Sequence, residues 1–306
     1  MLAIFLKTVP FFLLIALGYG AARGRMFTAE GIAYITKFVF YFALSAMLFR
    51  FASSLSFSEI WDPPLILAYL AATAAVYLLV TLVALLRRTG FAEAAIEAQC
   101  GVIGNTGFLG LPMLIILIGE AAAGPIIIML SVDLIVFGSI IVTIILLARG
   151  REERSLLATV LGGLLKNPMV MSMSLGLGWG ALGLPIPDPA AEFLLILGAA
   201  ATPCALFAIG ASLADKSAER LSVALWLSFA KLVLHPLAVA FAALHVFEIS
   251  TFKAGVMIAT SAMPVAGNIF IIAQQYGVAP ARASSAILVS TILSVATLTV
   301  VISMVT

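Results

Sequence analysis

Two asparagines lie in the middle of apolar stretches, and their side-chain amides could bind a carboxylate inside a membrane. Asn105 falls in the apolar run from about 96 to 119, and Asn268 falls in the run from 254 to 277. A carboxylate that enters a membrane must lose water, and an amide NH2 group can donate hydrogen bonds to it without a fixed charge that would be costly in an empty site. The alternative is that each asparagine pairs only with carbonyl groups that a break in its own helix exposes.

Ionisable side chains also fall within apolar runs, where charge is expensive and by default functional. Asp133, near the middle of its run, could exchange a proton during transport. It could instead pair with Lys231, which has His235 one helical turn further on, because buried charges are usually paired. Lys37 could extend its ammonium group toward the membrane surface, or it could attract an anion toward the site.

Both asparagines belong to segments in which a continuous helix is not expected. Residues 101–112 contain four glycines and end at Pro112, and the second segment contains Pro264. Proline removes a helical hydrogen bond and crowds the preceding turn, and glycine has a low helical propensity. The helix is therefore predicted to fail in both segments, and the freed backbone groups need protein, water or ligand as partners. Two interrupted spans of this kind are typical of a secondary transporter whose site lies where its halves meet.

The composition indicates an all-α polytopic membrane protein. Of the 306 residues, 63% are hydrophobic and 10% charged, and the mean hydropathy is +1.22, which excludes an ordinary soluble domain. The net charge of +2, without a basic run interleaved with aromatics, gives no indication of nucleic-acid binding. Cys100 and Cys204 are expected to be buried free thiols. No metal-ligand cluster, cofactor motif or Ser-His-Asp arrangement is visible, so a transporter is favoured over an enzyme.

The apolar runs predict ten membrane spans, at about 2–22, 31–52, 63–86, 94–119, 123–148, 167–184, 190–213, 221–246, 254–277 and 281–305. Lys and Arg gather in the cytoplasmic loops of membrane proteins, and this fixes the orientation. With both termini outside, the inner side receives Arg23, Arg25, Arg87, Arg88, Arg149, Arg151, Arg154, Lys166, Lys216, Arg220 and Arg282. The outer side then keeps only Lys7, Arg50 and Lys253.

The chain also repeats itself after 158 residues. This shift aligns Pro10 with Pro168, Gly18 with Gly176, Phe49 with Phe207 and Gly119 with Gly277. Each copy would hold five spans, an odd number, so the second copy must enter the membrane in the opposite direction. The predicted division is a first repeat at 1–148, an amphipathic helix in the cytoplasmic interface at 149–166, and a second repeat at 167–306.

Four segments resemble the auxin efflux carrier family. They are Gly-Asn-Thr-Gly-Phe-Leu-Gly-Leu-Pro at 104–112, Phe-Val-Phe-Tyr-Phe-Ala-Leu-Ser-Ala-Met-Leu-Phe at 38–49, the Met-Pro break that runs on to Ala-Gln-Gln-Tyr-Gly at 263–277, and Ala-Ser-Ser-Ala-Ile-Leu-Val-Ser-Thr at 283–291. The resemblance covers the whole chain, and the family includes bacterial malonate and organic-acid permeases and the plant PIN-type auxin carriers. It implies ten helices in two five-helix inverted repeats, as in bile-acid symporters and sodium/proton antiporters. Helices 4 and 9 would cross at their breaks, with a scaffold packed against a mobile crossover domain. Ser45 stands where the family often has proline, although its repeat mate is Pro203.

The resemblance implies a secondary transporter that moves a small organic anion, such as an auxin-like acid, malonate or another dicarboxylate, across the plasma membrane by alternating access. The residues expected to contact the substrate are Asn105, Asn268, Thr106, Gly107, Met263 and Ser45. An open alternative is a proton- or sodium-coupled carrier of the same fold with Asp133 as the coupling residue. The expected partners are the anion and the lipid bilayer, without a cofactor or nucleic acid, and a homodimer is left open.

Overall fold

The computed structural model describes residues 2–55, 61–149, 153–214 and 221–305, and within these ranges it contains helices and no strand. By length and composition, six helices in the described ranges could cross a membrane: Ala29–Ser53, Pro63–Leu86, Glu120–Ala148, Asp188–Leu213, Leu221–Val246 and Pro280–Val305. Shorter apolar helices cover Val9–Arg23, Thr106–Ile118 and Leu157–Lys166. The chain is therefore an all-helical, multi-pass membrane protein, as its composition predicted.

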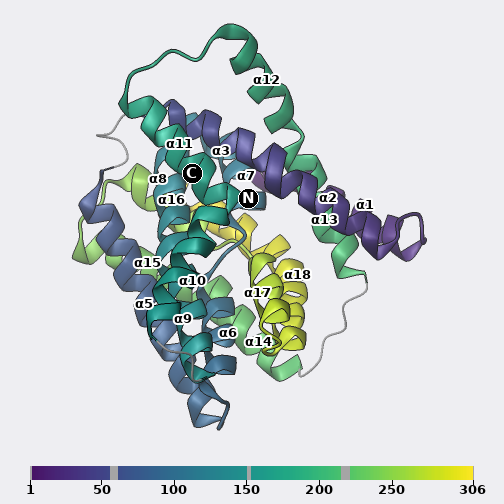
Figure 1. Ribbon diagram of the computed structural model, residues 1–306, viewed down its shortest axis with the longest axis vertical. Helices are drawn as coiled ribbons and strands as arrows, with labels where there is room; N and C mark the ends of the chain where they lie inside the picture. Colours follow the sequence, from purple (N-terminus) through teal and green to yellow (C-terminus); the bar gives the residue numbers. More distant parts are fainter. Residues whose placement is uncertain (1, 56–60, 150–152, 215–220, 306) are drawn as a thin grey trace.

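The helices form two groups by their packing, and in Figure 1 the first lies toward the top and most of the second lies below it. We call the upper one the scaffold group. Its members are α1 (Leu2–Arg23), α2 (Ala29–Phe38), η1 (Val39–Ala43), α3 (Leu44–Ser53), α11 (Pro168–Ala181), α12 (Asp188–Ala199) and α13 (Ala201–Leu213). Within it α1 packs along α13, and α3 packs along α11.

The other group contains both interrupted helices, and we call it the crossover group. Its members are α5 (Pro63–Leu86), α6 (Phe91–Val102), η2 (Thr106–Gly110), α7 (Leu111–Ile118), η3 (Glu120–Ala122), α8 (Ala123–Val132), η4 (Asp133–Phe137), α9 (Gly138–Ala148), α14 (Leu221–Phe229), η5 (Ala230–Leu234), α15 (His235–Phe241), η6 (Ala242–Val246), α16 (Thr251–Ser261), α17 (Asn268–Gln275) and α18 (Pro280–Val305). The two groups meet where α13 packs against η2, α1 against α7 and α18, and α3 against α8.

Side-chain caps fix where three of these helices begin. The side chains of Thr28, Asp62 and Asn167 each accept a hydrogen bond of 3.0 to 3.1 Å from a backbone N–H in the first turn of α2, α5 and α11, respectively. Such caps satisfy N–H groups that have no partner within the helix. Proline also stands at the start of α5 and α11, where its missing N–H costs nothing.

Two glycines let the scaffold helices approach backbone to backbone. A Cβ atom at Gly18 of α1 would lie 2.0 Å from the carbonyl oxygen of Phe207 in α13. A Cβ atom at Gly176 of α11 would lie 2.7 Å from the carbonyl oxygen of Phe49 in α3. Any larger residue would force these helices apart, so each pair is held at a separation that only glycine allows.

Five π-helical turns occur in the described ranges: η1, η2, η4, η5 and η6. Asp133 is the first residue of η4, and Lys231 lies in η5. The π-turns are frequently found at functional sites, and two of the five contain Asp133 and Lys231, which the sequence analysis also identified.

The predicted linker at 149–166 falls partly on residues 150–152, which lie outside the described ranges. From Glu153 to Lys166 the chain forms helix α10, which packs between α9 and α11. Leu157, Leu161 and Leu165 lie at helical spacing and are exposed. A helix with an exposed leucine row fits the prediction of an amphipathic segment, and its position in the membrane interface stays a prediction.

Candidate functional site

The two interrupted helices meet at their breaks. Helix α6 ends at Val102 and α16 ends at Ser261. The segments that follow pair as an isolated antiparallel bridge between Gly104 and Val265. Helix α16 also packs against η2 and α7, which follow the first break. The prediction that helix fails in both segments is therefore confirmed.

Backbone groups freed by one break are satisfied by the other. The N–H of Asn105 donates to the carbonyl of Pro264 at 2.7 Å, and the N–H of Ala266 donates to the carbonyl of Ile103 at 3.1 Å. The N–H of Val265 donates to the hydroxyl oxygen of Ser290 in α18, at 3.0 Å. An unpaired backbone group would be costly at this depth, so these bonds stabilise the crossing.

The two prolines have different places in the two breaks. Pro264 lies within the second break, where its carbonyl takes part in the pairing. Pro112 lies beyond the non-helical residues 103–105, in the helical segment Thr106–Ile118. It follows directly after the π-turn η2, so the helix is distorted in the turn before this proline.

Asn105 and Asn268 line the same small cavity beside the crossing. Asn105 precedes the first residue of η2 and is 6% exposed, and Asn268 is the first residue of α17 and half-buried. Among the described residues, the Oδ1 atom of Asn268 is buried without a hydrogen-bond partner. Each asparagine thus stands at the start of the second half of its interrupted helix, where partial positive charge favours an anion.

The cavity has a volume of about 30 Å³. Its full lining is Ile103, Gly104, Asn105, Gly107, Phe108, Leu130, Asp133, Leu134, Met169, Ala266, Gly267 and Asn268. This is room for about one or two water molecules, whereas ligand sites usually measure about 300 Å³ or more. The cavity in this structure is therefore too small to hold more than water.

Met169 of α11 is the scaffold residue that closes the cavity. A Cβ atom at Gly107 would lie 2.6 Å from the terminal methyl carbon of Met169, so this side chain reaches the backbone of η2. Met169 is 4% exposed. No pattern in the sequence identified Met169, because a methionine in an apolar helix is usually only a packing residue.

Three of the six expected contact residues lie away from the cavity. Thr106 and Met263 are buried but do not line it, and Met263 packs against Gly104 and Gly110 instead. The Ser45 hydroxyl donates to the carbonyl of Phe40 in its own helix at 3.1 Å. The structure brings together Asn105, Asn268 and Gly107 only.

Asp133 lines the cavity, and its carboxylate accepts a hydrogen bond from a tyrosine. The Tyr69 hydroxyl of α5 donates to Asp133 Oδ1 at 2.7 Å, and Asp133 Oδ2 is buried without a partner among the described residues. The sequence did not reveal Tyr69, since one aromatic residue in an apolar run carries no pattern.

Lys231 has other partners than the expected carboxylate. Its Nζ donates to the carbonyl of Ser261 at the end of α16 and lies 3.2 Å from His235 Nδ1. The opposite ring nitrogen of His235 is 3.0 Å from the Thr73 hydroxyl. No ion pair within 4.0 Å joins Lys231 to Asp133 in the described part of the chain. A cation at a helix C-terminus is favourable, so Lys231 stabilises the first half of the second broken helix.

Lys37 lies outside the site. It is exposed on α2, and its Nζ is 5.5 Å from the centroid of the Tyr34 ring. No group of three or more His, Cys, Asp or Glu side chains that could hold a metal occurs among the residues that the structure describes.

Comparison with known proteins agrees with this geometry. The family described as "Membrane transport protein" matches residues 3–302. A protein of Rhizobium meliloti (strain 1021) with the name "Putative malonate transporter" is 32% identical over 300 residues, which cover 95% of this chain and 92% of that protein. With paired helix breaks at its centre and a family match along nearly its whole length, the chain belongs to the membrane transport proteins of the auxin efflux carrier family, and it is a transporter rather than an enzyme.

Proposed function

We propose that this protein is a secondary transporter for a small dicarboxylate of the malonate type, which it binds at the crossing of its two broken helices. The observation that carries the proposal is the location of Asn105 and Asn268 on one cavity, next to the paired breaks. The malonate class comes from the name of the Rhizobium meliloti relative.

The chemistry of the site suits this substrate. Two amide groups supply N–H donors without net charge, so the empty site costs less in a membrane than one built from arginine or lysine. The N-termini of the two helical segments that begin beside these asparagines add partial positive charge. Gly107 and Gly267 leave backbone without side chains in the lining, which allows a ligand to come close.

An inverted repeat of two five-helix units, 1–148 and 167–306, is part of the proposal. The 158-residue shift converts the contact between Gly18 and Phe207 into the contact between Gly176 and Phe49, and both contacts occur. A further aligned pair, Gly119 and Gly277, shares positive φ values of 112° and 58°. Equivalent contacts, and glycines with positive φ after corresponding helices, are what a repeated unit predicts, and they support ten spans in two copies.

Alternating access would proceed by movement of the crossover group against the scaffold group. The site lies where η2 meets α13 and Met169, so separation of the groups would open it. Backbone hydrogen bonds join the two broken helices at the crossing, so the crossing can move as one body, as in carriers built from inverted repeats. The loop charges support a plasma-membrane orientation with both termini outside.

Counterflow of radiolabelled malonate into proteoliposomes tests the proposal. Asn105→Ala and Asn268→Ala should each reduce saturable uptake by about tenfold or more, since one lost hydrogen bond to a charged group is worth about 1.5–3 kcal/mol. Gln275→Ala is the matched control, because Gln275 is an exposed amide on α17 that does not line the cavity. Folded variants of both asparagines with unchanged malonate uptake would refute this site.

A second candidate is a carrier of the same fold that is coupled to protons or sodium through Asp133. The observation in its favour is the buried Oδ2 atom of Asp133, which has no partner among the described residues although Asp133 lines the cavity. An intramembrane carboxylate is expensive and usually functional. Malonate uptake should then depend on a proton or sodium gradient, and Asp133→Asn should abolish that dependence while exchange of malonate continues. Gradient dependence that survives in Asp133→Asn rules out this role.

A further inference from the structure

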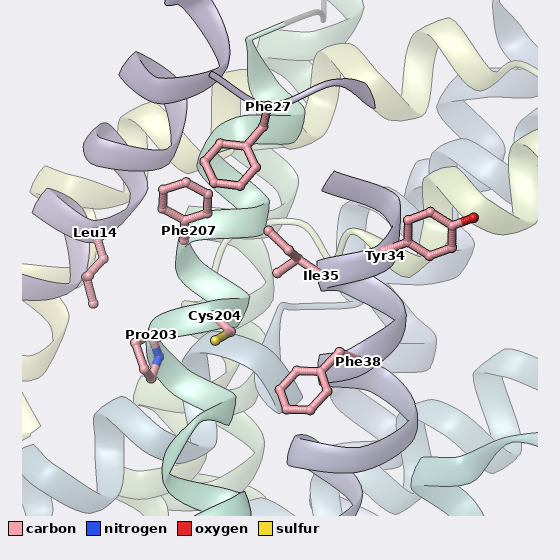
Figure 2. Close-up of a pocket in the computed structure, with 8 residues that line it drawn as sticks. All are labelled: Leu14, Phe27, Tyr34, Ile35, Phe38, Pro203, Cys204 and Phe207. Carbon is pink, nitrogen blue, oxygen red and sulfur yellow. The ribbon is translucent and has the colours of Figure 1, made fainter. Parts of the chain in front are cut away.

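An apolar groove lies on the scaffold group and shares no lining residue with the cavity at the crossing. Its volume is about 580 Å³. Figure 2 shows Phe27 and Phe207 near one end of it, and Phe38, Pro203 and Cys204 toward the other. The complete lining is Leu14, Phe27, Tyr34, Ile35, Phe38, Pro203, Cys204 and Phe207. None of these side chains carries a charge, so the groove favours a hydrocarbon occupant.

The length of the groove matches one leaflet of a bilayer. It follows α2 from Phe27, just before the helix, to Phe38 at its end. This distance corresponds to about 16 Å of helix, and the hydrocarbon core of a membrane is about 30 Å thick. Since the whole span is Ala29–Ser53, the groove accompanies roughly its first half, from the membrane surface to about the midplane.

The surrounding medium supplies an occupant for this groove. Extended hydrocarbon chains are the main component of a bilayer core, and the groove is lined by uncharged, mostly apolar side chains along a leaflet's depth.

Positive charges gather at the surface end of the groove. Arg23 at the end of α1 and Arg25 in the turn that follows it are exposed, four and two residues before Phe27. A lipid phosphate is the group that complements such a cluster at a membrane surface.

We propose that this groove binds an acyl chain of an anionic phospholipid whose phosphate lies against Arg23 and Arg25. Phe27 and Phe207, with ring centroids 5.3 Å apart, would pack beside the part of the acyl chain that is nearest the phosphate. Because α13 also packs against η2 at the crossing, the bound lipid supports the helix on which the crossover group moves.

Cys204 makes the groove testable with a thiol-reactive fluorophore. Cys204 is half-buried in the groove lining, whereas Cys100 is fully buried, and a Cys100→Ala background leaves Cys204 as the only thiol. The matched control probe is Leu78→Cys in a cysteine-free background. Leu78 is 67% exposed on α5, eight residues before the end of its span, while Cys204 is nine residues before the end of α13. Under the proposed topology both probes face the same leaflet at a similar depth.

The protein is reconstituted in phosphatidylcholine with about one tenth phosphatidylglycerol, and only the phosphatidylglycerol chains are brominated. We expect bromine to quench the Cys204 probe at least twofold more than the Leu78→Cys probe, because the groove concentrates the anionic lipid. Arg23→Ala with Arg25→Ala should reduce the quenching at Cys204 to the level of the control.

Two results would overturn the proposal. One is equal quenching at both probes, which would mean that no lipid is enriched in the groove. The other is Cys204-to-Cys204 cross-linking between two copies by a short bifunctional maleimide together with weak quenching, which would mean that a second copy covers the groove. Brominated phosphatidylcholine in place of the anionic lipid tests the headgroup, and equal enrichment of the two lipids would refute the role of the basic cluster.

Discussion

The backbone N–H of Asn105 donates a 2.7 Å hydrogen bond to the carbonyl of Pro264, so a residue proposed to bind substrate is held by the other broken helix. The position of the Asn105 amide therefore depends on the second break as well as on its own. Lys231 adds a further connection, because it binds the carbonyl of Ser261 and lies next to Gly104. Changes at the crossing should affect both halves of the site together.

Gly104→Ala tests how closely the crossing is packed. A Cβ atom there would lie 3.2 Å from Cε of Lys231 and 3.2 Å from Cβ of Met263. Since both neighbours are buried, we expect a loss of about 1–3 kcal/mol in the free energy of unfolding, and a loss of malonate counterflow. Denaturant titration in detergent measures the first quantity and proteoliposome uptake the second.

The control for this variant is Gly178→Ala in α11. Gly178 is exposed, and a Cβ atom there meets nothing within 4 Å. This change should leave transport intact and raise stability by up to about 1 kcal/mol through helix propensity. If Gly104→Ala behaves like Gly178→Ala, the crossing is not tightly packed around Gly104.

The helix breaks could be predicted from the sequence because their cause is local. Glycines and prolines inside an apolar run lower helical propensity wherever the chain folds, and both breaks occur where the pattern placed them. The pattern does not fix the residue at which the helix stops, because the non-helical residues are 103–105 and Pro112 follows the π-turn η2.

Long-range partners could not be predicted in this way. The bridge between Gly104 and Val265 joins residues that are distant in sequence, and nothing in either segment alone selects the other. Thr106 and Met263 adjoin the breaks but do not line the cavity, because packing between helices decides which side chains face it. Asp133 was identified from its charge, whereas its partner Tyr69 resembles any aromatic residue of an apolar span.

Tyr69→Phe should destabilise the protein. The change removes the hydroxyl that donates to Asp133 at 2.7 Å and leaves that carboxylate without its one described side-chain donor. A hydrogen bond to a charged group contributes about 1.5–3 kcal/mol, which is the expected loss. Denaturant titration of the purified protein gives the measurement.

Tyr77→Phe is the matched control on the same helix. Tyr77 is 5% exposed, and its hydroxyl is buried without a hydrogen-bond partner in the described part of the structure. Removal of an unpaired buried hydroxyl should leave stability unchanged or raise it. Equal losses in the two variants would mean that the bond between Tyr69 and Asp133 contributes nothing of its own.

Glu97→Gln should destabilise the end of the crossover group where α6 begins. The Glu97 side chain is 0% exposed and forms ion pairs with Arg87 and Arg282. A neutral amide would leave Arg87, which is 34% exposed, without its carboxylate and Arg282 with Glu93 alone, so the expected loss is that of a hydrogen bond to a charged group, about 1.5–3 kcal/mol. Because Arg282 belongs to the first turn of α18, the contact between α6 and α18 should weaken first. Thermal unfolding in detergent and hydrogen exchange of α6 measure the two effects.

The same cluster supplies the control for Glu97→Gln. Glu93 also pairs with Arg282, at 2.9 Å, but its side chain is 41% exposed. Solvent screening limits such a pair to less than about 1 kcal/mol, so Glu93→Gln should have a small effect. A loss as large for Glu93→Gln as for Glu97→Gln would contradict the assignment of the main stabilisation to the buried carboxylate.

Met169→Ala should change the size of substrate that the protein accepts. Met169 reaches from the scaffold group to Gly107 and closes a cavity of about 30 Å³ that the two asparagines also line. Truncation removes most of this side chain and enlarges the space next to the amides. Since one methylene group is worth about 10- to 200-fold in a fitted apolar pocket, the ratio of succinate to malonate counterflow should rise by about tenfold or more.

Met173→Ala is the control, because Met173 is equally buried one turn further along α11 and does not line the cavity. Its selectivity should stay that of the unmodified protein. If both methionine variants lose stability and neither changes the succinate-to-malonate ratio, Met169 packs the scaffold without limiting the substrate.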